Sequence, residues 1–242
     1  MTHESALIRD LVDHGVLDAP IAAHLSLLLD AGLPLTILAP ESRQSQRVAE
    51  AFAASLRASQ SGSPRSELHV ESDHHFEWLA DPVGIGCMDP AAGTAPRGAR
   101  TMLLRVSHLL SGLEPLTARI ALRSLARGYQ AIIEAQAPDL LTLLETLRTS
   151  PFRIPEDDLQ QLGLVICLDE RRLIAAHLLH PSAGTTRRPP TLLTIWDSAA
   201  SRWDDFTWAA LPVFAERSRI SQAQYDAIHR SRASLLKAEA SR

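Results

Sequence analysis

Apolar residues recur along the chain at two different spacings, which alternate from one segment to the next. In segments 5–14 and 19–30 they lie three or four positions apart, which predicts two helices. Segment 33–39 is an unbroken apolar run, short enough to be a buried strand. A polar turn at 40–46 follows, and then helical spacing to about residue 59. Strand, turn and helix in this order open an α/β unit.

The same alternation continues to the end of the chain. A segment dense in Pro and Gly, 81–100, is expected to be a long surface loop. The expected strands are 68–71, 101–107, 130–134, 164–168, 173–179 and 192–197. The expected helices are 115–127, 139–148, 156–161, 211–217 and 221–239. The last three strands are joined by short loops, so they are expected to be antiparallel and to finish the sheet edge.

The length of 242 residues and the apolar content of 45% are enough for one domain with a sizeable core. The predicted domain covers residues 1–242. We divide it into four parts: leading helices (1–32), an α/β core (33–168), C-terminal strands (169–210) and C-terminal helices (211–242).

The charge pattern does not indicate a nucleic acid or an anionic membrane as a partner. The net charge is -4, and the arginines are scattered along the chain. Of the 24 basic residues only Lys237 is a lysine, and it lies near the end of the chain. Mechanisms that need an internal lysine, such as a P-loop lysine or a Schiff base, are therefore excluded.

Cysteine usage and the N-terminus bear on the compartment. Cys87 and Cys167 are far apart and lack paired spacing, which excludes a disulfide framework and a cysteine zinc site. The N-terminus lacks a signal-peptide pattern, and no uncharged apolar run reaches about 18 residues. A soluble, unprocessed, cytoplasmic protein without membrane insertion is expected.

Three stretches, in this order, resemble one known family. The first is LIRDLVDHGVLDAPIAAHLSLLLDAGLPLTILAP, the second is LARGYQAIIEAQAPDLLTLLETL, and the third is TSPFRIPEDDLQQLGLVICL with RRLIAAHLLHP and LLTIWD. They resemble, respectively, the phosphate-loop strand with its leading helices, the histidine segment with its helix, and the C-terminal strands of the ATPases of type II and type IV secretion and of pilus or archaellum assembly. The resemblance covers about Ala6 to Trp208. It implies a RecA-like P-loop core sheet flanked by helices, with antiparallel C-terminal strands.

The chain departs from this family at the phosphate loop. The family motif is Gly-x-x-x-x-Gly-Lys-[Ser/Thr], whose glycines let backbone N–H groups wrap the phosphates while the lysine neutralises them. Here Ala39 and Gln44 occupy the glycine positions, Ser45 the lysine position and Gln46 the hydroxyl position. Glu41 adds negative charge to the same segment, so a standard triphosphate site is not expected.

Two further chemical centres of the family are also altered. His108 occupies the position of the glutamate that orients the attacking water. Gln136 stands in place of the histidine of Thr-x-His-Ala-Asp-Ser, and Pro138 displaces the aspartate. The first hypothesis is therefore a pseudo-ATPase without cofactor, with a structural or regulatory role in a homo- or hetero-oligomer with family ATPases.

Two alternatives stay open. One is an NTP-dependent motor that uses ATP and Mg²⁺ through substituted contacts, with Arg43 or Arg47 replacing the lysine and Ser45 holding the metal. The other is a metal-dependent hydrolase, because a strand would place four N and O ligands suited to zinc or manganese on one face. These ligands are His69, Glu71, Asp73 and His75. A polar edge strand is the competing interpretation.

Other functional side chains have simpler default interpretations. Trp196, Trp203 and Trp208 are interpreted as packing of the last sheet layer, with stacking on a ligand base as the alternative. Arg171-Arg172 resemble arginines that reach a neighbouring subunit's phosphate, but they fit turn or interface charges as well. His24 is expected in the core or at an interface rather than as a metal ligand. Asp204-Asp205 is expected in a solvated loop.

Overall fold

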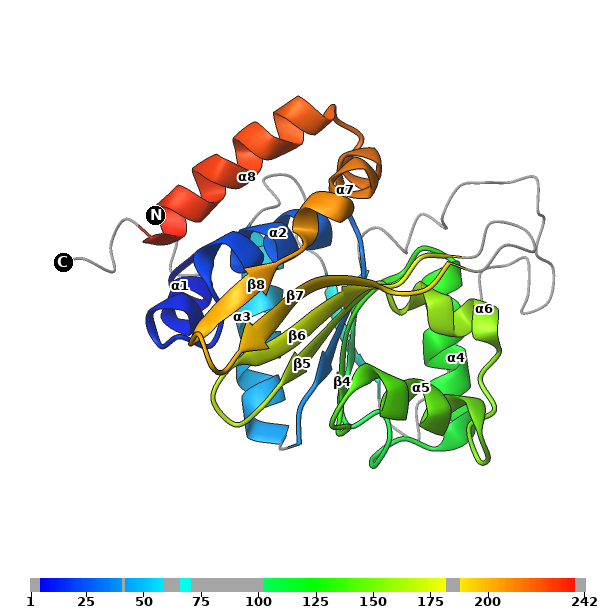
Figure 1. Cartoon of the computed structure of the whole chain (residues 1–242). Coiled ribbons are helices and arrows are strands. Elements are labelled where there is room, and N and C mark those ends of the chain that lie inside the picture. The colour runs from blue at the N-terminus through cyan, green and yellow to red at the C-terminus, as the bar shows by residue number, and fades with distance from the viewer. Residues whose placement is uncertain (1–4, 41, 59–65, 71–101, 182–187, 238–242) are drawn as a thin grey trace.

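The computed structural model of the chain describes residues 5–40, 42–58, 66–70, 102–181 and 188–237. Within these residues the fold is α/β, with eight strands in one mixed sheet and eight α-helices (Figure 1). The strands are β1 (Leu35–Leu38), β2 (Ser66–Val70), β3 (Met102–Val106), β4 (Gln130–Ala135), β5 (Leu164–Leu168), β6 (Leu173–Leu178), β7 (Thr191–Asp197) and β8 (Arg202–Asp205). The helices are α1 (Ser5–Asp13), α2 (Ala19–Asp30), α3 (Ser42–Ala58), α4 (Pro115–Ala126), α5 (Leu140–Arg148), α6 (Glu156–Leu159), α7 (Leu211–Ser218) and α8 (Gln222–Lys237). The predicted loop at 81–100 lies outside the described residues.

The sheet has a parallel half and an antiparallel half. Its strand order is β2-β3-β4-β1-β5-β6-β7-β8, and the pairs from β2 to β5 in this order are parallel. The pairs from β5 to β8 are antiparallel. Segment 164–168 was expected to be an antiparallel strand. This is confirmed for its pairing with β6 and wrong for its pairing with β1, which is parallel. Strand β5 returns through α5 and α6 on the same face, and such a crossover brings a strand back parallel to its neighbour.

Strand β8 was not predicted. It covers the segment Arg202–Asp205, where a solvated loop around Asp204-Asp205 was expected. The strand pairs with β7 at the sheet edge and has only intermediate or exposed positions, so no apolar run marks it in the sequence.

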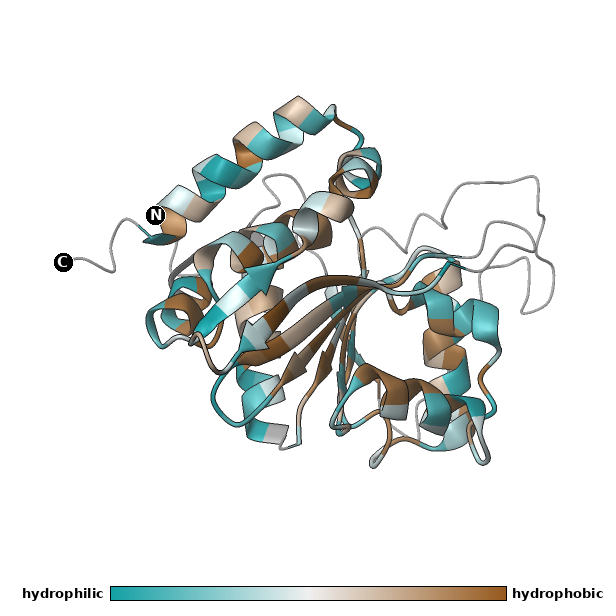
Figure 2. Cartoon of the chain, viewed as in Figure 1, coloured by the Kyte–Doolittle hydropathy of each residue, from teal (hydrophilic) through white to brown (hydrophobic). Residues whose placement is uncertain are grey.

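Two apolar cores lie on the two faces of the sheet. Helices α1, α2, α3, α7 and α8 contribute to one core, and α4, α5 and α6 contribute to the other. Figure 2 shows hydrophobic strands at the centre and hydrophilic outer helix surfaces. Strands β1 and β5 are buried along their whole length, which explains why they read as continuous apolar runs. No helix among the described residues is long and apolar enough to cross a membrane.

Helix α3 begins inside segment 40–46, which was expected to be a polar turn. It starts at Ser42, so only residues 39–41 connect it to β1. The buried positions Ser45, Val48 and Phe52 follow one another at helical spacing. The buried face of the helix therefore extends back through the segment that was expected to be a turn.

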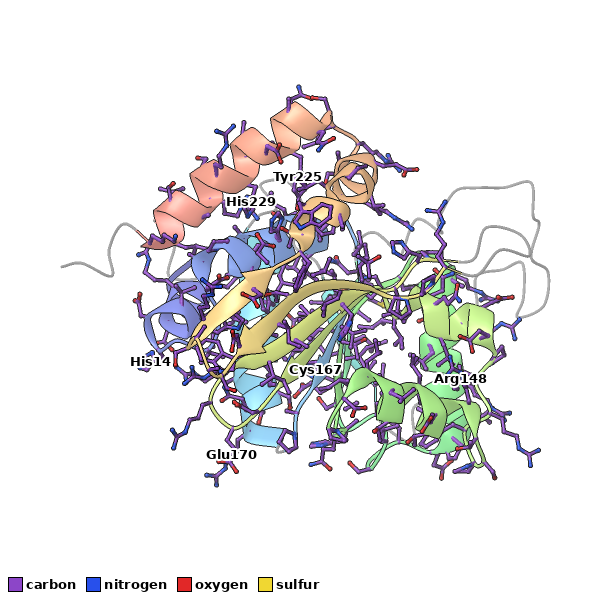
Figure 3. The ribbon with its side chains drawn as sticks, in the orientation of Figure 1. His14, Arg148, Cys167, Glu170, Tyr225 and His229 are labelled. Carbon is purple, nitrogen blue, oxygen red and sulfur yellow. The ribbon has the colours of Figure 1, made fainter. Side chains whose placement is uncertain are left out.

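Aromatic rings attach α8 to α2. His24 is 4% exposed, as expected for a core histidine, and its Nδ1 lies 3.0 Å from the Tyr225 hydroxyl. Its ring stacks on that of His229 with centroids 3.6 Å apart. Figure 3 labels His229 and Tyr225, which both belong to α8. Burial lowers the pKa of His24 to about 3. An ion pair of 2.8 Å between Arg232 and Asp30 joins the same two helices.

Acidification should destabilise the fold through His24. Because its folded pKa of about 3 lies below the unfolded value of about 6.5, the unfolded state binds the proton more tightly. Stability is therefore lost as the pH falls below the unfolded pKa, by about 2 kcal/mol between pH 7 and pH 5. Urea unfolding at both pH values measures this loss.

The variant His24→Phe should remove the part of the pH dependence that His24 contributes, while His177 and His180, whose pKa values burial also lowers, keep theirs. Its stability at pH 7 is expected to fall because Tyr225 loses its partner. The matched control is His14→Phe, since the side chain of His14 is 60% exposed. Equal pH dependence in the wild type and in His24→Phe would contradict this assignment.

Candidate functional site

The topology places a crevice at the carboxyl ends of β1 and β4. The chain leaves β1 for α3 on one face of the sheet and leaves β4 for α5 on the other face. Open α/β sheets bind ligands where neighbouring strands are continued in opposite directions in this way. The segment that was compared with a phosphate loop, 39–46, begins at the same point, directly after β1.

Backbone contacts close this crevice. Ala39 is 1% exposed, and its N–H donates to the carbonyl of Ala135 at 3.2 Å. The N–H of Leu109 donates to the carbonyl of Glu134 at 2.9 Å. Of the remaining positions of the phosphate-loop frame, Arg43, Gln44, Ser45 and Gln46 belong to α3. A phosphate loop presents successive N–H groups from non-helical backbone, and here only residues 39–41 connect β1 to α3.

A buried carboxylate occupies the position next to this frame. Glu134, on β4, is 6% exposed. The hydroxyl of Ser45 donates to its Oε2 at 3.1 Å, and the hydroxyl of Ser107 donates to its Oε1 at 3.3 Å. Ser45 itself is 4% exposed. The side chain at the lysine position is thus directed into the protein interior.

A buried arginine completes the group. Arg105, on β3, has a side chain that is 3% exposed, and its Nη2 lies 2.9 Å from Oε1 of Glu50 and 3.9 Å from Oε1 of Glu134. Its Nη1 lies 3.7 Å from Oε2 of Glu67 on β2. We call these residues, with the two serines, the Arg105 cluster. A buried charge is tolerated when opposite charges surround it, and here three carboxylates surround one guanidinium.

Sequence reasoning did not identify Arg105 and Glu134 as site residues. Each is the one ionisable residue of an otherwise uncharged buried strand, MLLRV and QAIIEA. A charged residue inside such a run is unusual, because charged side chains are rarely buried unless paired. This signal could have identified both residues, but the pairing depends on the order and register of β3 and β4.

The other two family positions lie apart from the cluster. His108 is exposed, with a left-handed φ of 56°, and its carbonyl accepts from the Gly112 N–H at 2.7 Å. A Cβ at Gly112 would lie 2.7 Å from the His108 Cβ, so this tight turn requires glycine. Gln136 is exposed after β4. Asp139 accepts from the Thr142 N–H at 2.7 Å as the N-cap of α5, and this bond lowers the pKa of Asp139.

The predicted metal cluster falls largely outside the described residues. His69 is described, as an exposed residue of β2 opposite Arg105 in the strand register. Glu71, Asp73 and His75 lie outside the described residues. Within the part of the chain that the structure describes, no three His, Cys, Asp or Glu side chains are grouped to hold a metal.

No protein-family model matches the chain, and no curated protein sequence matches it either. The chemistry of the site must therefore be inferred from its geometry. A carboxylate that accepts from two hydroxyls and lies beside a buried guanidinium is a polar network, in which the buried Nε and Nη1 of Arg105 have no hydrogen-bond partner among the described residues. Such a network stabilises the contact between α3 and the sheet.

Removing the guanidinium should strongly destabilise the fold. We expect Arg105→Leu to lower the free energy of unfolding by about 3 kcal/mol or more, because Glu134 and Glu67 lose their opposite charge in a buried setting. Urea unfolding measures the change. Adding Glu134→Gln should restore part of the loss, since it removes one uncompensated charge.

The matched control is Arg202→Leu. The Arg202 side chain is 71% exposed and pairs with Asp204 at 3.4 Å, so its loss should cost about 0.5 kcal/mol or less. A similar, small effect for both variants would show that the Arg105 cluster does not stabilise the fold.

Proposed function

We propose that the chain is a pseudo-ATPase: a non-catalytic relative of the secretion and pilus-assembly ATPases whose RecA-like core has a structural or regulatory role. The observation that carries the proposal is the Ser45 contact with Glu134 at 3.1 Å. At the position where the family binds phosphate with a lysine, this chain has a short buried side chain bonded to a carboxylate.

The sheet topology supports the proposal. Strand β1, which corresponds to the phosphate-loop strand of the family, lies inside the parallel half between β4 and β5. The three antiparallel pairs that follow are compatible with the C-terminal strands that the resemblance implies. The architecture is thus compatible with descent from such an ATPase.

The charges near the crevice disfavour a triphosphate. Three carboxylates and one guanidinium make up the charged groups of the Arg105 cluster. A bound triphosphate would add several negative charges next to this excess of carboxylates, and like charges in a poorly solvated site repel strongly. Within the cluster, Glu134 accepts from two hydroxyls and Arg105 donates to Glu50, so these groups are paired with one another.

The candidate replacement arginines give the motor alternative little support. Arg47 pairs with Asp10 at 2.6 Å, so its charge is already engaged. Arg43 is exposed in the first turn of α3. As a pseudo-ATPase, the chain would act through subunit contacts, in a homo-oligomer or beside an active ATPase of the family.

The proposal predicts no Mg²⁺-dependent ATP binding. Titration with a fluorescent ATP analogue and Mg²⁺ should show no saturable binding up to about 1 mM, and no steady ATP turnover should be measurable. Micromolar Mg²⁺-dependent binding would contradict the proposal.

Arginine variants would then identify the binding site. Loss of such binding in Arg43→Ala, but not in Arg123→Ala, would favour a motor with substituted contacts. Arg123 is the matched control because it is also an exposed helical arginine, on α4, which packs on the opposite face of the sheet.

A further inference from the structure

A cavity of about 450 Å³ lies beside the first turn of α3. Its walls come from the end of α1, the start of α3, the turn between β5 and β6, and strands β7 and β8. We call it the Trp–Arg pocket. The residues that matter for its chemistry are His14, Arg47, Arg171, Arg172, Trp196 and Trp203. Its volume falls within the range of about 300–1,000 Å³ that is typical of small-molecule sites.

The Trp–Arg pocket lies apart from the crevice at the carboxyl ends of β1 and β4. Figure 3 shows His14 and Glu170, which both line the pocket, at the same corner of the molecule. The Arg105 cluster lies between α3 and strands β2, β3 and β4, whereas the pocket opens on the β5–β8 side of α3. A ligand in the Trp–Arg pocket would therefore not need to displace the buried ion pairs.

Two indole rings form the apolar wall. Trp196 and Trp203 are directly opposite each other on β7 and β8, and their rings meet edge to face with centroids 4.6 Å apart. The indole N–H of Trp203 donates to the carbonyl of Leu173 at 2.8 Å, which fixes the ring. Since its N–H is already bonded, this ring offers the pocket apolar surface, against which a flat apolar body can pack.

Two guanidinium groups supply unpaired positive charge. The carboxylate of Asp169 accepts from the backbone N–H groups of Arg171 and Arg172 at 2.7 and 2.6 Å, which orders the turn. Among the described residues, neither arginine side chain has a carboxylate partner within ion-pair distance. The Arg172 guanidinium lies 4.2 Å from the ring centroid of Trp196. This stacking holds it in place while its N–H donors stay available.

The remaining charges favour an anion. Asp10 pairs with Arg47 at 2.6 Å and with His14 at 3.1 Å, so the charge of Arg47 is engaged. Glu170 is the one carboxylate in the pocket lining, against Arg171 and Arg172. The first turn of α3 adds the positive end of a helix dipole, because Gln44 of that turn also lines the pocket.

We propose that the Trp–Arg pocket binds a small organic anion, in which a carboxylate or phosphate group is joined to a flat apolar body. The anion meets the guanidinium groups of Arg171 and Arg172, which match the two oxygens of a carboxylate or phosphate. The flat body packs against Trp196 and Trp203. This site goes beyond the pseudo-ATPase role and does not require Mg²⁺.

The test is an NMR titration of the full chain with ¹⁵N-labelled tryptophan. Benzoate and phenyl phosphate are the probes, benzamide is the uncharged control, and inorganic phosphate is the control without a flat body. Both aromatic anions should shift the indole signals of Trp196 and Trp203, assigned by Trp→Phe variants. The signal of Trp208, which is 69% exposed and outside the pocket, should not move. The preferred probe then distinguishes a carboxylate ligand from a phosphate ligand.

The double variant Arg171→Gln/Arg172→Gln should weaken binding about tenfold or more, and the matched variant Arg202→Gln should not. Because Arg172 stacks on Trp196, the double variant also removes this stacking contact. The single variant Arg171→Gln keeps the contact, and it should lose part of the affinity for the aromatic anions. Unchanged melting temperatures verify folding.

Three results would overturn the proposal: no saturable shift up to about 10 mM probe, equal binding of benzamide and benzoate, or full affinity in the double variant. Tighter binding of a single-stranded oligonucleotide at the same signals would also overturn it, in favour of a nucleic-acid site. Titrations with and without Mg²⁺ distinguish this site from an ATP site. Binding of the aromatic anions that does not depend on Mg²⁺ and is lost in the double variant supports the Trp–Arg pocket and leaves the pseudo-ATPase proposal unchanged.

Discussion

Burial of β1 on both faces is the constraint on which the rest of the structure depends. The strand pairs in parallel with β4 and β5, helices cover both sides of the sheet, and all four of its residues are buried. In such a setting every backbone and side-chain polar group needs a partner within the protein. The N–H of Ala39 finds one in the carbonyl of Ala135, and this bond continues the pairing beyond the strand and helps to close the crevice.

The same requirement explains the Arg105 cluster. Arg105 and Glu134 point to the face that α3 covers, because residues two apart on a strand share a face, and Leu103 and Ile132 lie in the core on that side. Neither charge is stable there alone, so the hydroxyls of Ser45 and Ser107 and the carboxylates of β2 and α3 pair with them. In a phosphate-binding protein, a ligand and its metal would complete the charge balance at this edge of the sheet. Here three carboxylates surround the one guanidinium of Arg105.

Exposure separates the two regions next to α3. Ser45 and Glu134 are buried and bond to each other, whereas neither arginine of the β5–β6 turn has a carboxylate within ion-pair distance among the described residues. The first region therefore contributes to stability and the second is available for binding. At the far side of the helical layer, the stacked rings of His24 and His229 hold α8 against α2 and make this attachment sensitive to acid.

The sequence by itself determined most of the local structure. Helical spacing placed α1, α2, α4 and α5 almost to the residue, apolar runs placed β1, β3, β4 and β5, and the single lysine, Lys237, removed a lysine-dependent phosphate site. Only the tertiary structure decided that β5 is parallel to β1, that Ser45 bonds to Glu134, and that Arg171 and Arg172 share a pocket with Trp196 and Trp203. The physical reason is distance along the chain: periodicity reports which face of an element is buried, but strand order and register decide which remote side chain meets that face.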